Sequence, residues 1–141
     1  MIQIDYPSYS FRFKEENKKE LIFDEIRKLW VRLTPEEWVR QNFIQYLIQI
    51  KKYPSALFGI EKEIKLGELK KRCDIVIYKN AQPWMIIECK ETNVNLNDIT
   101  AQQILGYNMA LKASYLILTN GHQTFGLETA TQLFLSTLPD Y

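Results

Sequence analysis

The chain has 141 residues, of which 46% are hydrophobic and 25% are charged, and its formal net charge is +1. This composition excludes an intrinsically disordered chain, and no apolar run approaches the ~18 residues of a membrane span. One histidine and two cysteines exclude zinc sites built on several histidines or four thiolates. We expect one soluble, cytoplasmic domain over residues 1–141, whose hydrolytic chemistry would rest on carboxylates, lysine and an oxygen-bound metal ion.

Residues 1–33 form an N-terminal extension ahead of a core that spans residues 34–128. Within the extension, the run Leu21–Asp24 is typical of a strand. Residues 25–31 fit either a short helix or a continuation of that strand, and their pattern leaves both readings open.

The core begins with a helix. Thr34 suits the N-cap, Pro35 the first helical position, and Glu37 the third residue of a capping box. Apolar residues then recur at helical spacing, and lysines suit the negative end of the helix dipole. We therefore expect a helix from Pro35 to Lys51 or Lys52.

Strands and a second helix follow along the chain. The expected elements are strands over residues 60–66, 72–78 and 84–90, a helix from Asn97 or Asp98 to about Ala113, and strands over 115–119 and from Thr124 onward. This αβββαβ order predicts an α/β fold with a central mixed β-sheet flanked by helices.

The hairpin over residues 72–90 brings two carboxylates to one end of the predicted sheet. If its loop is centred on residue 81, Asp74 lies opposite Glu88, with Cβ atoms roughly 4.5–5.5 Å apart. Like charges so placed repel, so either one carboxyl is protonated or a cation lies between them, and oxygen ligands favour Mg²⁺ or Mn²⁺. Lys90 shares the face of Glu88, where it can orient a water or stabilise an anionic transition state.

The same register places the two cysteines opposite each other on the other face of the sheet. In a reducing compartment, we expect Cys73 and Cys89 to remain thiols that pack as small apolar residues. A register slip of one residue would move Asp74 to the wrong face.

Further candidates lie on the two helices. Glu37 either closes the capping box on the Thr34 amide or reaches the carboxylate pair as a further ligand. Arg40 and Gln41 lie one turn on, where they meet a phosphate or form the wet side of the helix. Gln103 and Tyr107 share a helix face, either as a surface glutamine and a packed tyrosine or as groups that reach over the metal to substrate.

Together these positions resemble the PD-(D/E)XK nuclease superfamily, and in particular the N-terminal nuclease-like domain of type I restriction enzyme R subunits. The signature is an aspartate followed by a strand that ends in Glu-x-Lys, although Cys73 replaces the usual proline before the aspartate. The matching segments are Asp74, Ile87-Glu88-Cys89-Lys90, Thr34 to Gln41, Gln103 to Tyr107, and Leu118 to Gly121.

The resemblance implies a restriction-endonuclease-like core and a metal-dependent nuclease that hydrolyses DNA in restriction, defence or DNA processing. Asp74, Glu88 and Glu37 would bind Mg²⁺ or Mn²⁺, with Lys90 as a further catalytic residue. The substrate-binding residues would be Gln103, Tyr107, Arg40 and Gln41. The expected partners are DNA and either a second copy of the chain or a restriction-type partner subunit, with no membrane.

Two alternatives remain open. One is a catalytically inactive nuclease-fold module that binds DNA or a partner subunit. The other is a structural domain in which Asp74 bonds to Lys90 or Arg72 and Glu37 only caps its helix. Fifteen basic and eleven acidic residues precede Asp74, so a nucleic acid would be held mainly by the first half of the chain.

Overall fold

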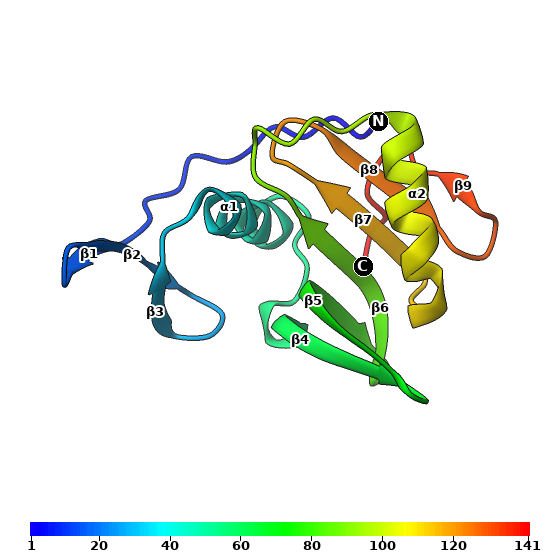
Figure 1. The fold of residues 1–141 in the computed structure, drawn as a ribbon, viewed down its shortest axis with the longest axis horizontal. Helices are drawn as coiled ribbons and strands as arrows, with labels where there is room; N and C mark the ends of the chain where they lie inside the picture. Colours follow the sequence, from blue (N-terminus) through cyan, green and yellow to red (C-terminus); the bar gives the residue numbers. More distant parts are fainter.

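The computed structural model describes residues 1–141 and contains two β-sheets and two α-helices (Figure 1). The predicted mixed sheet with flanking helices is confirmed. The elements in chain order are β1 (Phe13–Glu16), β2 (Lys19–Asp24), β3 (Leu29–Arg32), α1 (Pro35–Gln49), the 3₁₀ turn η1 (Ser55–Leu57), β4 (Phe58–Leu66), β5 (Leu69–Lys79), β6 (Gln82–Cys89), α2 (Asp98–Asn108), the 3₁₀ turn η2 (Met109–Leu111), β7 (Tyr115–Thr119), β8 (Thr124–Glu128) and β9 (Leu133–Phe134).

The N-terminal extension forms its own antiparallel sheet in the order β1-β2-β3. The open choice for residues 25–31 resolves into a turn over 25–28 and the strand β3. Asp24 accepts hydrogen bonds from the backbone N–H groups of Ile26 and Arg27, both at 2.8 Å, and these bonds fix the turn.

The larger sheet has the order β4-β5-β6-β7-β8-β9. Only β6 and β7 are parallel, and the chain between them crosses over through α2. The helix lies against β7 and β8, whereas α1 lies between the small sheet and β6 (Figure 1). Neither helix has the length and apolar character that a membrane crossing requires.

Two apolar cores cover opposite faces of the larger sheet. Residues that alternate along β5 divide between them, with Ile75 and Ile77 in the core of α1 and Val76 in the core of α2. Both faces are covered, so the central strands read as continuous apolar runs.

The hairpin of β5 and β6 has the predicted register beside the carboxylates, where Ile75 pairs with Ile87 and Ile77 with Met85. The turn is tighter than expected, because only Asn80 and Ala81 join the strands, with φ angles of 53° and 62°. A two-residue turn alone would shift the strand pairing by one residue from the expected register. An irregularity after Ile77 compensates for this shift, so the expected pairs form beside the carboxylates.

The expectation that the cysteines share a face is wrong. Cys73 packs in the core of α2 and Cys89 in the core of α1, and both thiols are free. Pairing between β4 and β5 is interrupted at Asp74, opposite which Glu61 has a left-handed φ of 51°. The alternation of side chains along β5 breaks at this point, so Cys73 turns to the opposite side.

Both helices end earlier than predicted. Ile50 follows the last residue of α1, so the helix stops before Lys51. The second helix ends at Asn108 and tightens into η2, and Lys112 then adopts a left-handed conformation with φ 58°. This residue prevents a continuous helix to Ala113.

Candidate functional site

The first turn of α1 directs Glu37 inward. Thr34 caps the helix as predicted, because its Oγ1 accepts a hydrogen bond of 3.1 Å from the Glu37 backbone N–H. The carboxylate of Glu37 does not close the capping box. It instead accepts hydrogen bonds from Arg40 and Gln41, one turn further along.

Arg40 is a buried cation among three carboxylates. Its Nε and Nη2 donate to the two oxygens of Glu37 at 2.9 and 2.6 Å, and its Nη1 donates to Asp74 at 3.0 Å. Glu61 accepts a further bond from Nη2 at 3.2 Å. Arg40 and Gln41 are 5% and 1% exposed, so the reading that they form the wet side of the helix is wrong.

A second arginine extends this network to the small sheet. Arg27 donates to the fully buried Asp24 at 2.7 Å and also lies within ion-pair distance of Glu37 and Glu61. Gln41 bridges Asp24 and Glu37, with its Nε2 at 3.0 Å from each carboxylate. We call this set the arginine cluster: Asp24, Arg27, Glu37, Arg40, Gln41, Glu61 and Asp74.

Asp74 joins the arginine cluster to the end of β6. Its second carboxylate oxygen accepts a hydrogen bond of 2.8 Å from the backbone N–H of Cys89. Asp74 therefore lies beside the Glu88–Lys90 segment, as the hairpin register predicts. Its side-chain bond to Arg40, however, turns it toward α1.

Glu88 lies in a separate and more open group. It accepts a hydrogen bond of 3.1 Å from Lys71 and forms an ion pair with Lys90 at 3.4 Å. Lys71 also donates to the buried Asn108 of α2 at 2.6 Å. We call these residues the lysine cluster: Lys71, Glu88, Lys90 and Asn108. No side chain bridges Asp74 and Glu88.

The pKa values of the two candidate metal ligands, Asp74 and Glu88, are shifted in opposite directions. Burial raises the pKa of Asp74 above its usual range, and the bonds from Cys89 and Arg40 offset only part of this effect. Burial by itself would raise the pKa of Glu88, but the charge and hydrogen bond of Lys71, together with Lys90 and Asn108, outweigh it and lower the pKa. At Glu37 burial likewise acts to raise the pKa, but Arg40, Gln41 and Arg27 together outweigh it, and the pKa is lowered.

The fit of these carboxylates to a divalent ion depends on their present partners. No group of three or more histidine, cysteine, aspartate or glutamate side chains is arranged to hold one. Asp74 and Glu88 carry oxygen ligands of the kind that Mg²⁺ takes, because this ion commonly binds through one or two carboxylates and keeps several waters, but both would first have to leave their basic partners. Glu37 does not fit as a third ligand, because Arg40 occupies both of its oxygens.

The two residues predicted on α2 lie apart from the carboxylates. Gln103 and Tyr107 are exposed, and Tyr107 is 86% accessible. Together with Ile99 they border an open hollow along the outer face of the helix. The reading of Tyr107 as a packed tyrosine is wrong.

Sequence reasoning missed several members of the two clusters. Asp24 could have been found from the sequence, because a carboxylate at the end of the apolar run of β2 is expected to be buried and to need a partner. Glu61 and Lys71 gave no such signal, since both stand in strands where charged residues alternate or form a run.

Comparison with known proteins gives one family. The family model described as type I restriction enzyme R protein N terminus (HSDR_N) matches residues 35–139. The matched range contains α1, the larger sheet and α2, and it leaves the small sheet outside. No curated protein matches the chain.

Proposed function

Since the chain belongs to the family of type I restriction enzyme R protein N-termini, we propose that it is a PD-(D/E)XK-type, restriction-endonuclease-like domain that hydrolyses phosphodiester bonds of DNA. The observation that carries the proposal is the meeting of Asp74 with the end of β6. The Asp74 carboxylate lies on the Cys89 amide, between Glu88 and Lys90 in the chain. An aspartate from the middle of β5 thereby lies beside the glutamate and the lysine at the end of β6.

In this proposal, Asp74 and Glu88 hold a Mg²⁺ or Mn²⁺ ion, which would stabilise negative charge on the phosphate and the leaving oxygen. Lys90, whose ammonium already lies 3.4 Å from Glu88, orients the attacking water. Glu37 acts as a positioning residue, because it fixes the guanidinium of Arg40 beside Asp74.

Substrate binding draws on basic side chains that lie beside the carboxylates. Lys71 is paired with Glu88, and a bound phosphate would take over this donor when an ion takes the carboxylate, whereas Arg40 would approach the phosphate without leaving Glu37. Gln103 and Tyr107 are free on the outer face of α2 to contact the DNA backbone. Restriction-type partner subunits, or a second copy of the chain, are the proposed protein partners.

Cleavage of supercoiled plasmid DNA tests the proposal directly. Wild-type protein should cleave with Mg²⁺ or Mn²⁺ and not with EDTA. Asp74→Ala and Lys90→Ala should lower the rate by roughly a hundredfold or more, as is usual when charge stabilisation is removed. The matched control is Lys65→Ala, an exposed lysine on β4 that should leave the rate unchanged. Equal rates in all four proteins would indicate a contaminating nuclease and remove the proposal.

A second candidate is an inactive nuclease-fold module that binds DNA or a partner subunit. It is favoured by the pairing of every candidate carboxylate with a basic side chain. This reading predicts no heat of Mg²⁺ binding by calorimetry, no metal-dependent cleavage, and salt-sensitive DNA binding that survives Asp74→Ala. Metal-dependent cleavage that is lost in Asp74→Ala would rule it out.

A further inference from the structure

A small cavity lies apart from both charged clusters, at the surface of α1. Its volume is about 230 Å³, below the range of drug-sized ligand sites and suited to a single flat ring. Its wall includes the indole of Trp38 and the polar side chains of Tyr6, Asn42, Thr92 and His122. We call it the strand-end cavity.

The cavity lies where the only parallel strands of the protein end. Thr92 follows β6, and His122 stands in the turn after β7. Lys90 N–H donates to the Thr119 carbonyl at 2.8 Å, so the two strands stay joined up to these loops. The carboxyl ends of parallel strands are where open α/β sheets bind ligands. The wall also includes Tyr6, which precedes the residues matched by the family model.

The lining carries the groups that recognise a flat heterocycle. Trp38 offers an aromatic face that is 40% exposed, and Asn42 and His122 offer donors and acceptors for a ring edge.

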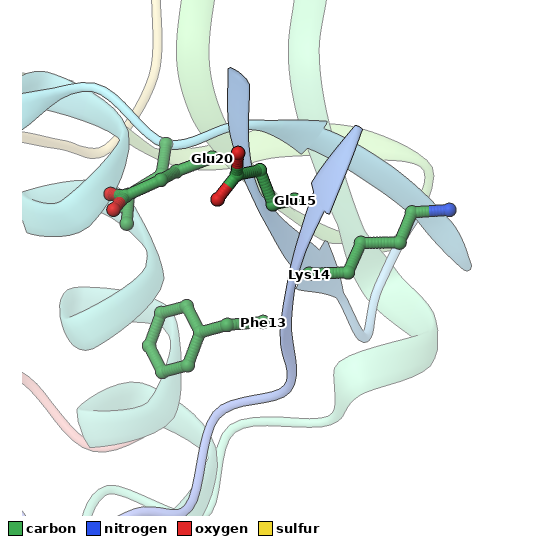
Figure 2. A pocket seen from close by; sticks show the side chains of 5 residues that line it. Phe13, Lys14, Glu15 and Glu20 are labelled. Atoms are coloured by element: carbon green, nitrogen blue, oxygen red, sulfur yellow. The ribbon is translucent and has the colours of Figure 1, made fainter. Parts of the chain in front are cut away.

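Aromatic rings continue from the cavity to the small sheet. Phe11 lies 5.1 Å from the ring of Trp38, and Phe13 lies 6.3 Å from it, measured between centroids. Phe13 is 54% exposed, and its ring points from β1 toward α1, whereas Lys14 extends to the other side of the strand (Figure 2). We call Phe11, Phe13 and Trp38 the aromatic row.

The aromatic row and the adjoining strand-end cavity together match the way in which proteins bind unpaired nucleobases. Proteins that bind single-stranded nucleic acid stack successive bases on aromatic side chains. We infer that the strand-end cavity takes one unpaired nucleobase of a DNA strand and that the aromatic row stacks the bases next to it. The inference rests on the proposed DNA substrate but not on cleavage.

Binding without cleavage tests the inference. Fluorescence anisotropy of a short labelled oligothymidylate, in EDTA and low salt, should give measurable affinity and tighter binding than a duplex of the same length. Trp38→Ala should weaken this binding about tenfold, the usual effect of losing one base–aromatic stack. Trp38→Phe, which keeps a ring, should restore most of it.

The matched control is Phe134→Ala on β9, an aromatic residue 43% exposed and outside the aromatic row. It should bind like the wild type. His122 is the only histidine, so the NMR signal of its ring Hε1 proton is assignable without ambiguity, and thymidine alone should shift that signal in the wild type and not in Trp38→Ala. Equal oligonucleotide binding by Trp38→Ala and wild type, or an unmoved His122 signal, overturns the inference. Metal-dependent cleavage in that case would leave the proposed function intact.

Discussion

The arginine cluster and the lysine cluster lie on the two sides of one strand end, yet they hold their charges in different ways. Arg40 is 5% exposed and binds three carboxylates, whereas the side chains of Lys71 and Lys90 are 37% and 38% exposed and converge on Glu88. The planar guanidinium fixes the directions of its bonds, and an ammonium on a flexible stem does not.

This difference indicates a structural role for the arginine cluster and an exchangeable role for the lysine cluster. Removing Arg40 from its carboxylates would leave buried charges without a partner, so the arginine cluster resists rearrangement. A lysine that is more than a third exposed can leave Glu88 for water or a phosphate at little cost. We therefore expect the lysine cluster to open first when a ligand reaches the strand ends.

The largest effect should come from Arg40→Met. The change leaves Glu37 and Asp74 without their main cation in a buried site, so the free energy of unfolding should fall by about 3–5 kcal/mol. Urea unfolding followed by circular dichroism measures this loss. Arg32→Met, an exposed arginine with no ion pair, is the control and should change stability little. Similar losses in both variants would mean that the arginine cluster does not stabilise the fold.

A smaller loss is expected from Lys71→Met. Exposure screens the pair with Glu88, but buried Asn108 also loses a hydrogen bond, so the free energy of unfolding should fall by about 1 kcal/mol. The neighbouring Lys70→Met is the control, because Lys70 is exposed and unpaired. A loss as large as that of Arg40→Met would erase the distinction between the clusters.

The smallest effect is a difference in pH dependence. Because the pKa of Asp74 is raised in the fold, its stabilising effect is present below its ordinary value of 3.8 and is lost as pH rises through the folded pKa. Glu88 has a lowered pKa, so its effect is present above 4.5 and is lost as pH falls through the folded pKa.

Two variants isolate these opposite slopes. Relative to the wild type, Asp74→Asn should gain stability as pH rises through the acid range, and Glu88→Gln should lose it. Urea unfolding at a series of acid pH values measures both differences. Parallel profiles for the two variants would show that the two carboxyls share one environment.

The sequence predicted the features that depend on local pattern. The cap at Thr34 and the strand over 115–119 follow from residue preference and from a continuous apolar run. The register of the β5–β6 hairpin was also predicted correctly from the assumed centre of its loop. The turn is shorter than expected, but the irregularity after Ile77 compensates for the difference.

The direction of individual side chains could not be predicted. The alternation along β5 breaks at Asp74, opposite a left-handed Glu61 on β4, and no glycine or asparagine at either position predicts such a break. The arginine cluster also depends on segments far apart, since Asp24 and Glu61 come from different sheets. Only the folded chain brings their charges to Arg40.

The left-handed residue Glu61 has a further consequence for association between molecules. Strand β4 is nine residues long and forms a free edge of the larger sheet, where its unpaired backbone groups could recruit a strand from another chain. The left-handed backbone of Glu61 and the charged side chains of Lys62, Glu63 and Lys65 make this edge a poor template for such pairing. The irregularity opposite Asp74 thus also disfavours edge-to-edge pairing with another chain.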